Sequence, residues 1–114
     1  MLSSIFSSTV PAADPRTIGD GEFADAVNNG NCLVVDVRET HEFAAGHIPG
    51  ALNLPLSTFD PLELPTGKAV VLVCQSGRRS LNALNQAQAA GRNDVRHYQG
   101  GFNGWRTLGG DVEV

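Results

Sequence analysis

Residues 68–80 read KAVVLVCQSGRRS, where a continuous apolar run ends at a cysteine and is followed by a polar, positively charged loop. The run AVVLVC (69–74) has the β-branched, apolar composition of a strand buried on both faces of a sheet. The segment after the loop, LNALNQAQAAG (81–91), has a helical composition and ends at Gly91. We therefore expect Cys74 to lie between the end of a buried strand and the start of a helix.

Strand and helix signals alternate along the rest of the chain. The other predicted strands cover residues 16–18, 32–37, 51–55 and 95–98, and the other predicted helices lie within residues 20–30, 40–46 and 100–110. In the helix after the loop, Leu81 and Leu84 are expected to face inward. This alternation is typical of an α/β layer structure with a mostly parallel sheet, in which ligands bind outside the carboxyl ends of the strands. Cys74 is predicted to lie at that edge.

The length and composition indicate one domain. With 114 residues, 41% hydrophobic and 18% charged, the chain can bury one core but not two. Residues 1–15 are predicted to be a flexible tail and residues 16–114 the domain. Two cysteines do not make a disulfide scaffold, and the N-terminal segment lacks the pattern of a secretory signal, so we expect a cytoplasmic protein. A signal removed before residue 1 would not be visible in this sequence.

The charge distribution bears on possible partners. The net charge of -4 argues against nucleic acid, and no apolar run is long enough for a membrane span. Residues 1–75 carry three basic and nine acidic side chains, whereas residues 76–114 carry five basic and three acidic ones. The positive part of the chain thus begins at the loop, which suits a small anion better than a polymer.

The loop has the composition of a site that activates a thiol. A thiolate is favoured at a helix N-terminus and beside cations, and Gly77 allows successive backbone N–H groups to point at one centre. A lone cysteine at this place is usually a small core residue, but two arginines and a glycine would add nothing to a core. The predicted site consists of the nucleophile Cys74 and the substrate-binding residues Gln75, Ser76, Gly77, Arg78, Arg79 and Ser80.

Three stretches of the chain resemble one known family. VVDVRETHEFAAGHIPGALNLP (34–55), VVLVCQSGRRS (70–80) and YQGGFNGW (98–105) are similar to the single-domain rhodaneses, which are thiosulfate and persulfide sulfurtransferases. The resemblance covers about residues 16–112, with the blocks in the family's order. It implies a rhodanese-like three-layer fold, with a five-stranded, mainly parallel sheet flanked by helices.

The resemblance also implies a chemistry. Cys74 would take a sulfur atom from thiosulfate or another persulfide and pass it to cyanide, glutathione or a protein thiol, without a cofactor. We expect a monomer, although nothing in the sequence decides the oligomeric state. Two alternatives remain: a rhodanese-like binding or regulatory module, and a cysteine phosphatase or arsenate-type reductase. The spacing Cys-x4-Arg from Cys74 to Arg79 is one residue shorter than the phosphatase spacing, which disfavours the second alternative.

Asp36 and Arg38 end a predicted strand at the same edge as Cys74. We expect them to support the loop from behind, and Arg38 can pair with Glu42 four residues later if one helix includes both. Cys32 begins the same strand and is therefore expected at the opposite edge, too far from Cys74 for a disulfide and inert in the core. His47 is interpreted as structural. No Cys–His cluster has the spacing of a metal site.

Overall fold

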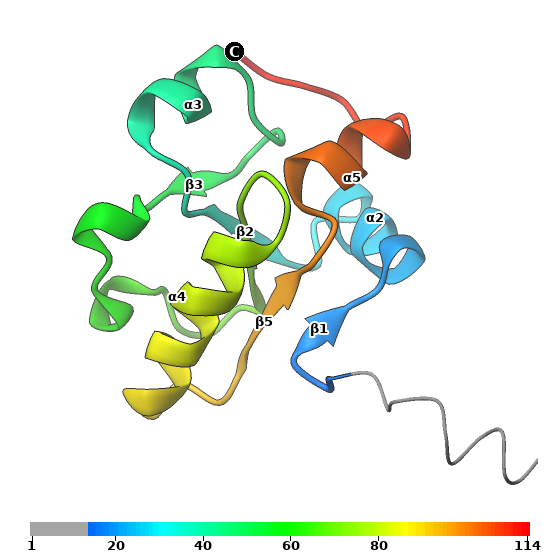
Figure 1. Ribbon diagram of the computed structural model, residues 1–114. Helices are drawn as coiled ribbons and strands as arrows, with labels where there is room; N and C mark the ends of the chain where they lie inside the picture. The colour runs from blue at the N-terminus through cyan, green and yellow to red at the C-terminus, as the bar shows by residue number, and fades with distance from the viewer. Residues whose placement is uncertain (1–13) are drawn as a thin grey trace, which may run out of the picture.

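The computed structural model describes residues 14–114, and the tail predicted for residues 1–15 lies almost entirely outside this part of the chain. The strands in the described residues are β1 (Thr17–Ile18), β2 (Leu33–Asp36), β3 (Leu52–Asn53), β4 (Val70–Val73) and β5 (Val95–Tyr98). The helices are α2 (Asp20–Asn28), α3 (Thr40–Ala45), α4 (Arg78–Ala89) and α5 (Gly101–Thr107), with short 3-10 turns η1 (Leu56–Thr58) and η2 (Pro61–Glu63). The predicted alternation is confirmed (Figure 1).

The five strands form one sheet in the order β1-β5-β4-β2-β3. Every pairing between these five strands is parallel, so the prediction of a mainly parallel sheet is confirmed. The central strand β4 is buried along its whole length, as its continuous apolar composition predicts. Its carboxyl end therefore lies in the middle of the sheet edge, where a parallel sheet binds its ligands.

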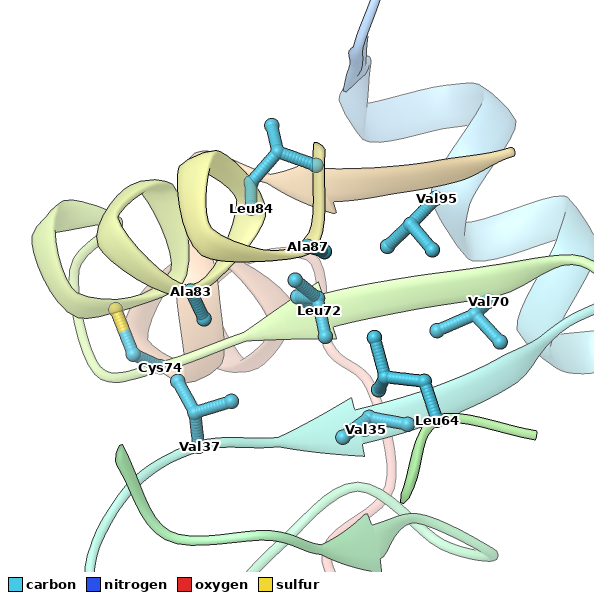
Figure 2. Packing of buried hydrophobic residues seen from close by; sticks show 10 residues of the cluster. All are labelled: Val35, Val37, Leu64, Val70, Leu72, Cys74, Ala83, Leu84, Ala87 and Val95. Atoms are coloured by element: carbon cyan, nitrogen blue, oxygen red, sulfur yellow. The ribbon is translucent and has the colours of Figure 1, made fainter. Parts of the chain in front are cut away.

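The sheet separates two cores. On one face, Val70, Leu72 and Cys74 pack with residues of α4 (Figure 2). On the other face, Val71 and Val73 pack in a cluster with residues of α2 and α5. Successive side chains of a strand point to opposite faces, so the alternation along β4 continues through Cys74 and directs its thiol toward α4. The structure thus has the three layers expected of this fold class.

Helix α4 packs on the sheet through a narrow stripe of mostly small side chains. Its buried residues are Ser80, Ala83, Leu84 and Ala87, which follow the spacing of one helix face. The prediction that Leu81 faces inward is wrong, because Leu81 lies one position off this stripe and is 39% exposed. Small residues allow the helix to approach the sheet closely, and the stripe places the hydroxyl of Ser80 above Cys74. No helix within residues 14–114 is long and apolar enough to cross a membrane.

A turn of two glycines brings the start of α5 against the residues that follow β4. The N–H of Phe102 donates to the carbonyl of Cys74 at 2.8 Å, and the N–H of Asn103 donates to the carbonyl of Gln75 at 3.1 Å. Gly101 has φ +64°, and a Cβ at this position would lie 2.6 Å from the Gln75 oxygen and 2.7 Å from the Cys74 oxygen. The close approach of the two backbones therefore requires glycine at position 101.

This contact predicts different effects for two glycine substitutions in the same part of the chain. Gly109 also has a positive φ, +80°, but nothing lies within 4 Å of its Cβ position. Gly109→Ala should cost about 1 kcal/mol for the left-handed backbone alone. Gly101→Ala should cost at least about 1–3 kcal/mol more, because two carbonyl groups must move. Urea denaturation of both variants measures the difference, and equal free energies of unfolding would contradict the close approach.

Candidate active site

The sulfur of Cys74 lies in a ring formed by its own loop and the start of α4. Cys74 is 1% exposed and follows the last residue of β4. Gly77 has φ +100° and ψ -17°, and this turn directs its N–H at the sulfur, with N and Sγ 3.0 Å apart. Helix α4 begins at the next residue, and the free N–H of Ser80 in its first turn also faces the sulfur. A side chain at position 77 would collide with the Gln99 carbonyl.

These donors change the acidity of the thiol. Burial by itself raises the pKa of Cys74, but hydrogen bonds from the Ser80 side chain and from the backbone N–H groups of Ser80, Gly77 and Ser76 outweigh it. The pKa of Cys74 is therefore below its ordinary value. The direction agrees with the sequence-based expectation. Of the two expected causes, the hydrogen-bond donors at the start of the helix produce the main effect, and the arginines of the loop do not.

Asp36 and Arg38 form a buried ion pair behind the loop. The guanidinium of Arg38 donates to both carboxylate oxygens of Asp36, at 2.8–3.1 Å, and the two side chains are 1–3% exposed. Arg38 Nη1 also donates to Gln75 Oε1 at 3.2 Å, and Arg38 Nη2 donates to the carbonyl of Gly46 at 2.8 Å. The guanidinium carbon lies 4.5 Å from the centre of the Phe102 ring. The pair thus contacts the loop through Gln75 from behind.

The two arginines of the loop have different surroundings. Arg79 is half-buried and donates to both carboxylate oxygens of Glu42, at 2.6 and 3.0 Å. The expectation that Glu42 pairs with Arg38 is therefore wrong, because Arg38 turns back to Asp36 instead. Hydrogen bonds from Arg79 hold the pKa of Glu42 at about 2, so this pair carries no net charge near neutral pH. Arg78 is exposed, and no ion pair within residues 14–114 includes it.

The two serines of the loop also differ. Ser76 is exposed, and its contribution to the sulfur is its backbone N–H. Ser80 is buried, and its Oγ lies 3.6 Å from Cys74 Sγ. A third residue joins them, because His97 Nδ1 lies 3.0 Å from Ser80 Oγ. The six loop residues predicted from the sequence are thus adjacent to Cys74, but only part of them direct a side chain toward it.

Several residues that lie around the loop were not predicted to lie there. They are Glu42, His97, Gly101 and Asn103, whose amide oxygen accepts from Gln75 Nε2. The glycine pair at residues 100–101 is a local signal that could have indicated a close backbone approach. Glu42 and His97 gave no such signal, because the partners they contact lie far away in the sequence.

Cys32 lies at the opposite edge of the sheet, as predicted. It precedes Leu33, which pairs with Val70 at the start of β4, whereas Cys74 follows the end of β4. Five residues at about 3.3 Å each place the two edges roughly 15–20 Å apart, and both cysteines are free. The prediction of a core position is only partly right, because Cys32 is half-buried. Burial raises the pKa of Cys32.

His47 has the contacts of a structural residue. Its Nδ1 lies 2.8 Å from the carbonyl oxygen of Phe43, and the two rings stack with their centres 3.7 Å apart. Within residues 14–114, no group of three His, Cys, Asp or Glu side chains could hold a metal ion.

The order of these features along the chain is that of a known family. The model of the rhodanese-like domain matches residues 20–108. The chain belongs to the rhodanese-like domain family. The resemblance found in the sequence is thereby confirmed, together with the fold that it implies.

Individual relatives of this rhodanese-like chain differ in length. It is 43% identical over 97 residues to the uncharacterized protein slr1261 of Synechocystis sp.. The matched region covers 83% of this chain and 51% of that protein. The chain thus spans about half the length of that relative. It is 31% identical over 109 residues to the thiosulfate:glutathione sulfurtransferase of Homo sapiens, over 82% of this chain and 95% of the human protein. The human single-domain sulfurtransferase TSTD1 superposes with a TM-score of 0.69 at 30% identity, over 82% of this chain and 97% of that structure.

The two cysteines should respond differently to pH. Because the loop lowers the pKa of Cys74 and burial raises that of Cys32, Cys74 should reach half of its maximal alkylation rate below the free-thiol value of about 8.5, and Cys32 above it. Iodoacetamide labelling across a pH series, followed by mass analysis of the two cysteine peptides, measures both midpoints. The urea-unfolded chain, in which they should coincide, is the control. A Cys74 midpoint at or above that of the unfolded chain would contradict the geometry described above.

Proposed function

We propose that this protein is a sulfurtransferase that carries a sulfane sulfur as a persulfide on Cys74. The observation that carries the proposal is the ring of polar groups around the Cys74 sulfur, in which the Gly77 N–H donates to the sulfur at 3.0 Å and the Ser80 hydroxyl lies 3.6 Å from it. Such a ring stabilises a negative sulfur, first as thiolate and then as the terminal sulfur of a persulfide. The relatives named as sulfurtransferases support the same chemistry.

In the first half-reaction, the Cys74 thiolate attacks the outer sulfur of thiosulfate. A bond forms between Sγ and that sulfur, the S–S bond of thiosulfate breaks, and sulfite leaves with the bonding electron pair. A low pKa maintains the attacking thiolate near neutral pH. Burial of Cys74 keeps bulk water from the persulfide.

In the second half-reaction, an acceptor attacks the terminal sulfur of the persulfide. The acceptor is the thiolate of a small thiol or of a protein, or cyanide. The bond between the two sulfurs of the persulfide breaks, and Cys74 leaves as a thiolate. A thiol of low pKa is a good leaving group, so the same donors around Sγ assist both half-reactions. Two sequential transfers through one covalent intermediate predict ping-pong kinetics.

The other loop residues have proposed roles in this reaction. The backbone N–H groups of Ser76, Gly77 and Ser80 hold the negative sulfur. Exposed Arg78 provides positive charge for an anionic donor, and Arg79 offsets the negative charge of the Glu42 carboxylate beside the loop. Asp36 and Arg38 position the loop through Gln75. The two alternative functions, a binding module and a phosphatase, differ from a sulfurtransferase in the mass expected for the protein after incubation with thiosulfate. Neither a binding module nor a phosphatase should gain about 32 Da, the mass of one sulfur atom, after incubation with thiosulfate.

Replacement of Cys74 should abolish the transfer without unfolding the protein. Cys74→Ser has a similar volume but a poor nucleophile at neutral pH, so neither the mass increase nor turnover of thiosulfate with glutathione should remain. Cys32→Ser is the matched control, since Cys32 lies at the other edge of the sheet, and its turnover should be near that of the wild type. Thiosulfate-dependent turnover by Cys74→Ser would refute the proposal.

The Arg79–Glu42 pair predicts opposite effects for its two members. Arg79→Ala leaves the Glu42 carboxylate unpaired, so kcat/KM for thiosulfate, a dianion, should fall about tenfold. Glu42→Gln frees the guanidinium, so kcat/KM should rise about two- to fivefold. Steady-state assays at low and high salt measure both effects, which should shrink with increasing ionic strength.

Glu22→Gln is the matched control for this experiment. It removes one carboxylate from an exposed ion pair with Arg96, outside the Cys74 loop, and changes the net charge by the same amount. It should leave kcat/KM nearly unchanged. If Glu42→Gln behaves like this control and Arg79→Ala has no effect, thiosulfate is not the donor that this loop captures.

A further inference from the structure

A buried histidine is connected to the candidate nucleophile through a single hydroxyl group. His97 is 3% exposed and lies on β5, with its side chain on the α4 face of the sheet. Its Nδ1 is 3.0 Å from Ser80 Oγ, and Ser80 Oγ is 3.6 Å from Cys74 Sγ. The three groups form a continuous chain across β4, α4 and β5. The reaction described above does not use His97.

The Ser80 hydroxyl has three neighbours but only one proton. Its Oγ also lies 3.2 Å from the carbonyl oxygen of Gly77, which can only accept a hydrogen bond. A Cys74 thiol can donate to Ser80, but a thiolate can only accept. If His97 Nδ1 carried no proton, the thiolate state would place three acceptors around one hydroxyl proton. The Gly77 carbonyl also accepts from the Leu81 N–H at 3.1 Å, and the sulfur also accepts from the Gly77 N–H at 3.0 Å. His97 Nδ1 has no other partner within residues 14–114, so a Ser80 hydroxyl that donates to the sulfur would leave Nδ1 unsatisfied against the Ser80 oxygen in a buried site.

We propose that His97 is a positioning residue that carries its proton on Nδ1 whenever Cys74 is a thiolate. In this state Nδ1–H donates to Ser80 Oγ, and the Ser80 hydroxyl then donates to Cys74 Sγ. In the thiol state the order is reversed: Cys74 donates to Ser80 Oγ, and the Ser80 hydroxyl donates to His97 Nδ1. The direction of the whole chain therefore changes with the charge on the sulfur.

This reversal provides a balanced route for the thiol proton. The proton of Cys74 passes to Ser80 Oγ, the Ser80 hydroxyl proton passes to His97 Nδ1, and the proton on Nε2 is released to water. The products are a thiolate, a neutral His97 with its proton on Nδ1, and one proton in solvent. No charge remains on the imidazole. A neutral ring agrees with burial, which lowers the pKa of His97.

The surroundings of His97 allow this release. His97 lines a pocket of about 390 Å³ together with Asp14, Thr17, Gly77, Arg78 and Leu81. Within residues 14–114, its Nε2 makes no hydrogen bond, in contrast to Nδ1. The charges that face His97 are Asp14 and Arg16 from the segment leading into β1 and Arg78 from the start of α4. Asp14 and Arg16 form an ion pair with each other. Asp14 raises the pKa of His97, and Arg16 lowers it.

The experiment measures the pH midpoint of Cys74 alkylation in variants of position 97. His97→Phe retains a planar ring but has no donor, so the midpoint should rise by about one pH unit, which corresponds to about tenfold less thiolate at neutral pH. His97→Asn should return the midpoint most of the way to the wild-type value, because its amide nitrogen can donate to Ser80 from about the place of Nδ1. His97→Leu replaces His97→Phe if the phenyl ring is not accommodated.

Two further variants separate this role from a general loss of stability. Tyr98 follows His97 on β5, and its side chain lies on the other face of the sheet. Tyr98→Phe removes its hydrogen bond to Asp20 and should leave the alkylation midpoint of Cys74 unchanged. Ser80→Ala should itself raise the midpoint. In the Ser80→Ala background, His97→Phe should cause no further shift, because its effect passes through the missing hydroxyl.

The role proposed for His97 rests on the proposed sulfurtransferase function, because it serves the thiolate of Cys74. The alkylation midpoint that tests this role can be measured without any turnover. An unshifted midpoint in His97→Phe, or an equal shift with and without Ser80, would overturn the role of His97 while leaving the Cys74 persulfide intact. Failure of the wild type to gain one sulfur atom from thiosulfate would instead overturn the proposed function. The mass experiment and the alkylation experiment therefore fail independently.

Discussion

Two backbone segments, residues 74–77 and 99–103, lie so close to each other that each needs a glycine facing the other. A side chain at Gly77 would meet the carbonyl of Gln99, and one at Gly101 would meet the carbonyls of Cys74 and Gln75. Hydrogen bonds from the start of α5 fix the outer side of the loop, while the Gly77 N–H remains directed at the sulfur on the inner side. The donors are thus in place before a negative charge forms on Cys74, so little reorganisation is needed when it does.

The buried pair of Asp36 and Arg38 connects this loop to the rest of the domain. A buried ion pair loses much hydration energy and is tolerated only where its remaining polar atoms are satisfied. Arg38 meets this condition with donors to Gln75 and to the carbonyl of Gly46, and its planar guanidinium lies over the Phe102 ring. One side chain therefore touches the end of β2, the end of α3, the loop and α5. The geometry of the sulfur site depends on all four elements through this contact.

Positive charge is less important to the thiolate than the composition of the loop suggests. Arg79 is neutralised by Glu42, and Arg78 is exposed. The stabilisation comes mainly from the backbone of the helix N-terminus and from the Ser80 hydroxyl. This arrangement lets a chain with a net charge of -4 hold an anionic sulfur. In the proposed function, capture of an anionic donor at the mouth and stabilisation of the sulfur inside the loop are thus separate tasks of different groups.

Local patterns in the sequence determined the parallel α/β sheet, the burial of β4, the place of Cys74 at its carboxyl end and the Gly77 turn before α4. Each of these follows from side-chain alternation, helix spacing or backbone freedom within about ten residues. Only the tertiary structure decided that Glu42 pairs with Arg79, that Arg38 turns to Asp36 and Gln75, and that His97 meets Ser80. These partners are up to 37 residues apart, and their distances depend on the strand order β1-β5-β4-β2-β3. Even Leu81, next to the loop, was misplaced. The helix face that packs on the sheet consists of Leu84 and the small residues Ser80, Ala83 and Ala87, and their close fit leaves Leu81 beside this face.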